Sequence, residues 1–204
     1  MRHIKKILSK VDKEGKETTK EKIVKVAMKL FAEKGYSDTS VNTIVREAGV
    51  SKGAFFHYWK SKEDLLREML DTYMSEVKQA YDALAGLNLS PKEKIRQIFR
   101  YVEQKHREHE DLPYMLVVFM RVIFTPGTPL REKYVSEFWK IIYEFIEKEL
   151  GIKGMPKGSG IVLISALGAY SLFKLTPDLI KLPNPDDIAD VIWDGIKSVA
   201  NAEG

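Results

Sequence analysis

Hydrophobic residues recur at intervals of three and four positions along most of the chain, which is the period of an amphipathic α-helix. No segment shows the alternation of apolar and polar residues, bounded by turns, that marks a strand. Capping residues, glycines and prolines separate the helical segments. The pattern therefore predicts an all-α protein of about nine helices. The predicted helices are 18–34, 40–48, 51–59, 61–85, 90–108, 112–124, 130–150, 159–175 and a last one that begins at 184.

Residues 39–65 hold the most informative local pattern, which is two short helices around a tight turn, followed by the start of a third. Ser40 and Ser51 are suited to cap the short helices, because a serine hydroxyl accepts a hydrogen bond from a first-turn amide. Gly49 follows the last apolar position of the first helix, where a left-handed residue needs no Cβ. Ser61 predicts the start of the third helix in the same way.

The second short helix has two different faces. Phe55, Tyr58 and Trp59 lie at i, i+3 and i+4, and we expect them to turn inward. A short, rigidly held helix with a basic and aromatic outward face is what reading of a DNA major groove requires. An ordinary helical hairpin that binds no DNA is the alternative. The outward face consists of Lys52, Gly53, Phe56 and His57.

The same segment closely resembles the DNA-binding domain of the TetR family of transcriptional regulators. The resemblance rests on the runs 48–53, 55–59 and 61–65, and it extends back to Ile23 in the preceding helix. It implies a three-helix DNA-binding domain with a helix-turn-helix, carried on a six-helix domain that binds a ligand and dimerises. The implied limits are 1–17 for a flexible basic arm, 18–62 for the helix-turn-helix DNA-binding domain and 63–204 for the effector-binding and dimerisation domain.

The resemblance also implies which residues contact DNA. Phe56 departs from the family pattern, because the family commonly has a tyrosine there whose hydroxyl reaches a phosphate. A phenylalanine offers only apolar contact, for example to a thymine methyl group. Lys62 lies at the N-terminus of the third helix, where free amides and the helix dipole also attract a phosphate. For Lys52 the alternative is a solvated surface lysine. The full set is Ser40, Asn42, Thr43, Ser51, Lys52, Gly53, Phe56, His57, Tyr58 and Lys62.

Positive charge is concentrated at the N-terminal end of the chain. Residues 1–60 carry 14 Lys and Arg against 7 Asp and Glu, a net charge of +7. The remaining 144 residues carry 19 against 22, a net charge of −3. A basic end on a mildly acidic remainder favours a polyanionic partner for that end alone. A solvated basic tail is the alternative for residues 1–16.

The residue inventory argues against several other classes of protein. The chain has no cysteine, so thiolate chemistry, disulfides and Cys-ligated zinc are excluded. We find no nucleophile with a base at recognisable spacing, and we predict no enzyme activity and no cofactor. His106 and His109 share a helical face, but a solvated helix end is favoured over a metal site. No secretory signal is present, and the apolar stretch 159–173 is shorter than the roughly 20 residues of a membrane span, so we expect a cytoplasmic protein without membrane contact.

An effector pocket is predicted between residues 115 and 173, where large apolar side chains exceed the needs of one core stripe. Arg121 lies within an apolar run and is a candidate anchor for an anionic head group. Its alternative is a snorkelling side chain or one paired with a glutamate. The candidate pocket residues are Met115, Phe119, Met120, Arg121, Phe124, Tyr134, Phe138, Trp139, Tyr143, Tyr170 and Phe173.

The last two helices are predicted to form the dimer interface. Small residues recur at four-residue spacing in the helix at 159–175, and small residues let helices approach closely. The same surfaces could instead pack within one chain. The candidate interface residues are Gly160, Ile164, Ser165, Gly168, Leu172, Val191, Ile192, Ile196 and Val199.

Taken together, these features favour a homodimeric transcriptional regulator. We expect it to act as a repressor on a double-stranded, pseudo-palindromic operator and to be released by a small, largely apolar effector, such as a fatty acid or an acyl conjugate. The alternative is an effector-independent, chromatin-type DNA-binding protein. The basic arm favours that alternative slightly, whereas the aromatic C-terminal part disfavours it.

Overall fold

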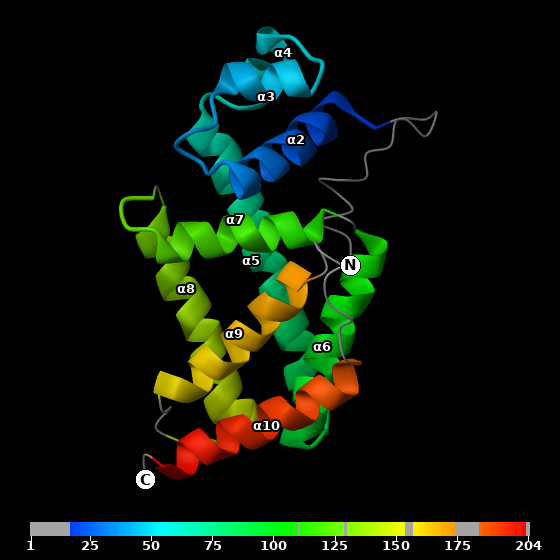
Figure 1. The fold of residues 1–204 in the computed structure, drawn as a ribbon, viewed down its shortest axis with the longest axis vertical. Coiled ribbons are helices and arrows are strands. Elements are labelled where there is room, and N and C mark those ends of the chain that lie inside the picture. The colour runs from blue at the N-terminus through cyan, green and yellow to red at the C-terminus, as the bar shows by residue number, and fades with distance from the viewer. Residues whose placement is uncertain (1–16, 110, 129, 154–156, 174–183, 203–204) are drawn as a thin grey trace. The chain divides into compact units, whose positions relative to one another are not determined.

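The computed structural model describes residues 17–109, 111–128, 130–153, 157–173 and 184–202. Within these residues the chain forms nine α-helices and no β-strand, so the predicted all-α fold is confirmed (Figure 1). Residues 1–16 of the predicted basic arm lie outside the described residues. The helices are α2 (Thr19–Glu33), α3 (Val41–Glu47), α4 (Lys52–Tyr58), α5 (Lys62–Ala85), α6 (Pro91–Glu108), α7 (Leu112–Phe124), α8 (Arg131–Glu144), α9 (Lys157–Phe173) and α10 (Pro185–Ala202).

The start of α2 illustrates how local chemistry sets these limits. The Oγ1 of Thr18 accepts a hydrogen bond of 3.2 Å from the amide of Glu21, and the Glu21 carboxylate accepts one of 2.7 Å from the amide of Thr18. This reciprocal capping box satisfies two amides that have no partner within the helix. At the other end, Gly35 has a φ of +94°, a conformation that L side chains rarely adopt, and the chain turns there toward α3.

The predicted helix 130–150 changes character near its end. α8 passes into a π-helical segment, η1 (Phe145–Glu149), in which the amide of Leu150 donates to the carbonyl of Phe145 at 3.1 Å. Phe145 and Ile146 are both buried, although they are adjacent in sequence. The spacing of apolar residues does not predict a π-turn. The turn inserts one residue and shifts the buried face, but it does not change which residues are apolar.

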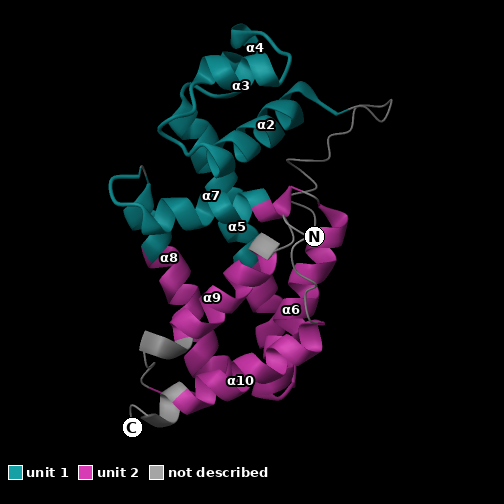
Figure 2. Ribbon diagram, in the orientation of Figure 1, with its two compact units in different colours: residues 1–77, 114–135 teal, residues 78–113, 136–204 magenta. Residues whose placement is uncertain are grey.

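The chain divides into two compact units (Figure 2). Unit 1 comprises residues 1–77 and 114–135, and unit 2 comprises residues 78–113 and 136–204. Unit 1 therefore holds more than the three helices α2–α4 of the predicted DNA-binding domain. It also contains most of α5, almost all of α7 and the start of α8.

Unit 1 has an apolar core to which each of its helices contributes. The rings of Tyr73 on α5 and Phe119 on α7 lie 5.0 Å apart between centroids. At the start of α8, the hydroxyl of buried Tyr134 donates to Asp71 on α5 at 2.7 Å. The fully buried side chains of this core include Ile23, Ala27, Ile44, Phe55, Leu65, Leu66, Leu70 and Phe119.

Unit 2 is built mainly from α6, α9 and α10. α10 packs along both α6 and α9, and Arg96 of α6 donates to Asp190 of α10 at 3.0 Å. The rings of Phe99 and Tyr170 meet edge to face at 5.8 Å and join α6 to α9. Lys94, which is buried, forms an ion pair of 2.5 Å with Glu149 of η1.

Candidate nucleic-acid interface

The two short helices α3 and α4 begin at the predicted serine caps. The Oγ of Ser40 accepts a hydrogen bond of 3.0 Å from the amide of Thr43, and the Oγ of Ser51 accepts one of 3.1 Å from the amide of Ala54. Gly49, between the helices, has a φ of +65°. The turn residue and both caps are therefore dictated by sequence, and together they fix the direction in which α4 leaves α3.

Two aromatic residues of the α4 region hold the helix on unit 1. Phe55 is fully buried, and Trp59 is 3% exposed. The prediction that Tyr58 also turns inward is wrong, because this side chain is 40% exposed. The helix ends at Tyr58 and Trp59 is extended, with φ −135° and ψ 137°, so the large indole takes the inward position at the end of the turn.

The opposite face of α4 is open. Lys52, Gly53 and His57 are exposed, and Phe56 is 47% exposed, which is unusual for a phenylalanine. The ammonium of Lys52 lies 6.0 Å from the centroid of the Phe56 ring. A cation beside an aromatic ring one turn later forms a surface that can meet both a polar base edge and an apolar methyl group.

On α3, Asn42 is exposed while Thr43 is half-buried. Ser40 lies just before the helix, and its Oγ is 3.0 Å from the Oγ1 of Thr43. The hydroxyls of Ser40 and Ser51 thus accept hydrogen bonds from backbone amides at the starts of α3 and α4. Asn42 keeps a side chain that projects into solvent beside them, so it remains the candidate for a base contact from α3.

Lys62 lies in surroundings that differ from those expected of a phosphate contact. Its Nζ donates to the carbonyl oxygens of Tyr36 at 2.6 Å and Thr39 at 2.7 Å. The same nitrogen lies 4.1 Å from the centroid of the Tyr36 ring. Burial lowers the pKa of Lys62, while the nearby Asp38 carboxylate acts in the opposite direction. The ammonium is therefore engaged within the chain, in the turn between α2 and α3.

The predicted effector residues are distributed over both units. In unit 1, Met115, Phe119 and Tyr134 are buried and Met120 is half-buried. Arg121 and Phe124 are exposed, Phe124 by 61%. In unit 2 Phe138 and Tyr170 are buried, Trp139 is half-buried and Tyr143 is exposed, whereas the side chain of Phe173 lies outside the described part of the structure.

The pocket hypothesis expected apolar side chains to enclose Arg121, but this residue is exposed. Its Nη1 lies 3.4 Å from the point that a Cβ on Gly35 would occupy. An arginine on an apolar helix can lay its stem along the surface and keep its head in water, which is the snorkelling alternative.

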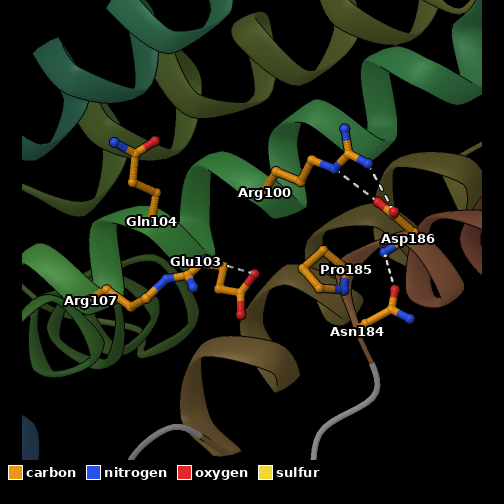
Figure 3. A pocket seen from close by; sticks show the side chains of 7 residues that line it. All are labelled: Arg100, Glu103, Gln104, Arg107, Asn184, Pro185 and Asp186. Carbon is orange, nitrogen blue, oxygen red and sulfur yellow. Dashed lines mark hydrogen bonds and ion pairs between the residues drawn. The ribbon is translucent and has the colours of Figure 1, made fainter.

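One cavity within unit 2 has a volume of about 490 Å³ and lies between α6 and the start of α10 (Figure 3). Arg100 donates to both carboxylate oxygens of Asp186, at 2.9 and 2.8 Å. Arg107 pairs with Glu103 at 3.2 Å. The cations and carboxylates of the wall balance one another, and none of the predicted effector residues contributes to it. The lining residues are Arg100, Glu103, Gln104, Arg107, Asn184, Pro185 and Asp186.

The predicted dimer residues differ in how far they are buried within the single chain. Gly160, Ile164, Gly168 and Ile196 are buried, so these small and apolar residues pack within the chain, where α9 meets its neighbours. Val191 is 72% exposed, and Ser165 is exposed on α9. Ile192 is half-buried, and the side chains of Leu172 and Val199 lie outside the described part of the structure. The exposed face of α9 is thus carried by Ser165 and by Ile161, one residue after Gly160.

The described part of the chain contains neither a cluster of metal-ligating side chains nor a membrane-spanning helix. No group of three or more His, Cys, Asp or Glu side chains in that part of the chain could hold a metal ion. Glu110, next to the candidate pair His106 and His109, lies outside it. None of the described helices is both long and apolar enough to cross a membrane.

Helices α2–α5 have the arrangement of a helix-turn-helix, in which one face of the second short helix, α4, is exposed. Residues 23–69 match the family described as "Bacterial regulatory proteins, tetR family". This match runs from Ile23 in α2, through α3 and α4, to Met69 in α5. The helix-turn-helix part of this chain therefore belongs to the family of TetR-type bacterial regulatory proteins, and relatives at 36% and 40% identity are named as HTH-type transcriptional regulators.

Individual relatives support this assignment. An uncharacterized HTH-type transcriptional regulator, YerO of Bacillus subtilis (strain 168), is 36% identical over 102 residues, which are 48% of this chain and 35% of the relative. The chain spans about a third of the length of the first curated relatives that it matches.

Solved structures extend the likeness of fold to most of the chain. A TetR-family transcriptional regulator from Bordetella parapertussis 12822 has a TM-score of 0.63 at 22% identity, covering 85% of this chain and 91% of its own. The transcriptional regulator FadR from Bacillus subtilis, solved in complex with stearoyl-CoA, has a TM-score of 0.56 at 16% identity, covering 87% and 97%. The similarity of fold to these two regulators therefore extends beyond the helix-turn-helix to the helices that follow it.

Proposed function

We propose that this protein is a dimeric, ligand-responsive repressor that binds a pseudo-palindromic operator through α4 and is released by a small, largely apolar effector. The observation that carries the proposal is the construction of α4. Its inward residues, Phe55 and Trp59, are buried, while Lys52 and Phe56 stand exposed on the other side. A helix anchored on one side by aromatic packing presents its other side in a defined orientation, as major-groove reading needs.

The face of α4 also suggests how the two kinds of contact divide. Lys52 can donate to the O6 and N7 acceptors of guanine, and Phe56 can pack against the methyl group of thymine. His57 and Tyr58, whose rings meet edge to face at 4.9 Å, can donate to phosphates. Phosphate contacts set the register of the protein on DNA, and base contacts specify the sequence.

Selection from random double-stranded DNA with the purified protein tests the proposal. We expect enrichment of an inverted repeat, and binding whose logarithm falls linearly with the logarithm of salt concentration. The variant Lys52→Ala should relax the preference at one position in each half-site by about tenfold, since a good base contact is worth about 1–3 kcal/mol. Equal loss on operator and random DNA would show that Lys52 only neutralises phosphate.

The effector part of the proposal rests on the apolar residues of the helical body and on the stearoyl-CoA complex of FadR, a protein with a similar fold. Long-chain fatty acids and their CoA thioesters are therefore the first probes to use. Release of operator DNA by an acyl-CoA, but not by free CoA, would support an apolar effector. Operator binding that no acyl compound alters, in a protein purified without bound ligand, would favour the effector-independent DNA-binding alternative.

A further inference from the structure

We infer that Lys62 is a positioning residue that fixes α3 for operator recognition, and that it does not act as a phosphate ligand. This inference rests on the proposed DNA-binding function. The side chain comes from the first residue of α5 and reaches back 26 residues in sequence to the turn between α2 and α3. There it binds the backbone of the segment that leads directly into α3.

Three groups of the α2–α3 turn lie around the ammonium of Lys62. A lysine ammonium has three N–H donors and no acceptor. Two of them point to the carbonyls of Tyr36 and Thr39, at 2.6 and 2.7 Å. The centroid of the Tyr36 ring lies 4.1 Å from the same nitrogen, which is within the range of a cation–π contact. A phosphate at this nitrogen would therefore compete with partners that the folded chain already supplies.

The carbonyls that Lys62 binds belong to the turn that leads into α3. The carbonyl of Tyr36 also accepts a hydrogen bond from the amide of Thr39, and the buried Thr39 hydroxyl donates to the carbonyl of Gly35 at 2.8 Å. Ser40, the N-cap of α3, is the next residue. Lys62 therefore holds the backbone immediately before the helix that carries Asn42, and ties it to α5.

Mutation of Lys62 would weaken DNA binding whether it is a phosphate ligand or a positioning residue, but the two roles predict different effects. A phosphate ligand contributes equally to any DNA and adds about 0.9 to the slope of log K against log salt. A positioning residue contributes to sequence recognition by placing other side chains. Its loss should weaken operator binding while leaving the salt slope and the binding of random DNA close to those of the wild type.

The experiment compares Lys62→Met with Lys60→Met, which removes the same charge from an exposed position two residues away. Both are titrated on operator and on random duplex DNA at several salt concentrations. We expect Lys62→Met to lose at least tenfold on the operator, with an unchanged slope and less than a twofold change on random DNA. Amide exchange without DNA should also be faster in α3 of Lys62→Met and unchanged in Lys60→Met.

A slope lowered by about 0.9, with equal losses on both DNAs and unchanged exchange in α3, would overturn the inference and leave the proposed function intact. Absence of sequence preference in the wild-type protein would instead overturn the proposed function. If Lys62→Met does not fold, Lys62→Arg makes the comparison with the charge retained. A planar guanidinium does not reproduce the geometry of an ammonium. Lost preference at an unchanged slope supports positioning, whereas wild-type binding of both DNAs by Lys62→Arg overturns it.

Discussion

The indole Nε1 of Trp59 donates a hydrogen bond of 2.8 Å to Oε2 of Glu68, which joins the residue after α4 to α5. The other carboxylate oxygen of Glu68 lies 2.7 Å from the ammonium of Lys20 on α2. That ammonium is in turn 5.7 Å from the Trp59 ring centroid. One carboxylate on α5 therefore connects α2 with the residue that follows α4, and it supplies the acceptor for the buried indole N–H.

Replacement of Glu68 by leucine should destabilise unit 1. The buried indole N–H would lose its acceptor, which costs about 1–3 kcal/mol, and we expect the free energy of unfolding to fall by this amount. Urea titration followed by tryptophan fluorescence measures the change. The control is Glu63→Leu on the same helix, which breaks a half-exposed pair with Arg67 and should cost less than about 1 kcal/mol. Equal losses for the two variants would contradict a special role for the Trp59–Glu68 bond.

Gly53→Ala should raise stability and lower operator affinity at the same time. A Cβ on Gly53 would meet only the Ser51 Oγ, at 3.7 Å, so alanine should stabilise α4 by about 0.5–1 kcal/mol. The added methyl group would stand on the exposed face, where close approach to DNA leaves little space. Thermal unfolding and operator titration measure the two effects.

The matched control for Gly53→Ala is Gly49→Ala. A Cβ there would meet no atom within 4 Å, yet the φ of +65° should make alanine unfavourable by about 1–2 kcal/mol. The two substitutions should therefore change stability in opposite directions. If Gly53→Ala binds the operator as tightly as the wild type, the DNA does not approach α4 closely at this position.

The helix-turn-helix could be predicted from sequence because its determinants are local. Ser40, Gly49 and Ser51 act through their own hydroxyls or backbone angles, so residue type and spacing suffice. Tyr58 was misplaced because a strict helical period assumes that the helix continues, whereas Trp59 is already extended. The predicted helix 130–150 corresponds to α8 together with η1, but its change to a π-helical turn at Phe145 could not be read from the hydrophobic period.

The roles of long polar side chains could not be predicted in this way. Lys62 binds carbonyls 23 and 26 residues away, and these partners are chosen by the tertiary fold. The buried stripe of Gly160, Ile164 and Gly168 shows a related ambiguity. Small residues on a helix indicate close packing, but the same pattern arises whether the partner helix belongs to the same chain or to another.

If the homodimer forms through α9 and α10, their exposed residues should control it. Val191→Glu places a charge at a position that is 72% exposed in the single chain, so the protomer should stay folded while the dimer dissociates at least tenfold more readily. Sedimentation velocity at several concentrations measures this change. Gly168→Leu should behave differently, because this glycine is already buried and overpacking costs about 1–3 kcal/mol. A stable dimer of Val191→Glu would move the interface away from this face.

Unit 2 should lose stability at high pH through Tyr170. Burial, together with the Glu103 carboxylate, raises the pKa of this phenol to about 12, against about 10 in an unfolded chain. Between these values the unfolded chain releases a proton that the folded chain retains, so stability falls as pH rises through that window. Tyr170→Phe should show a shallower fall above pH 10 than the wild type in thermal unfolding. Parallel curves for the two proteins would contradict the predicted shift.

Arg121 provides the test that separates the two readings of the apolar run in α7. Its exposed guanidinium beside Gly35 is not enclosed by apolar groups, so we expect Arg121→Met to keep its response to acyl ligands. The change in unfolding free energy should be within about 0.5 kcal/mol, as is usual for surface positions. Thermal unfolding and ligand-induced release of operator DNA measure both quantities. Arg131→Met is the comparison, because the Nε of half-buried Arg131 donates to the carbonyl of Ile123 at 3.0 Å and its loss should be more destabilising. If Arg121→Met binds the operator normally but no longer responds to acidic ligands, Arg121 is an effector anchor, and the conformation described here changes when the ligand binds.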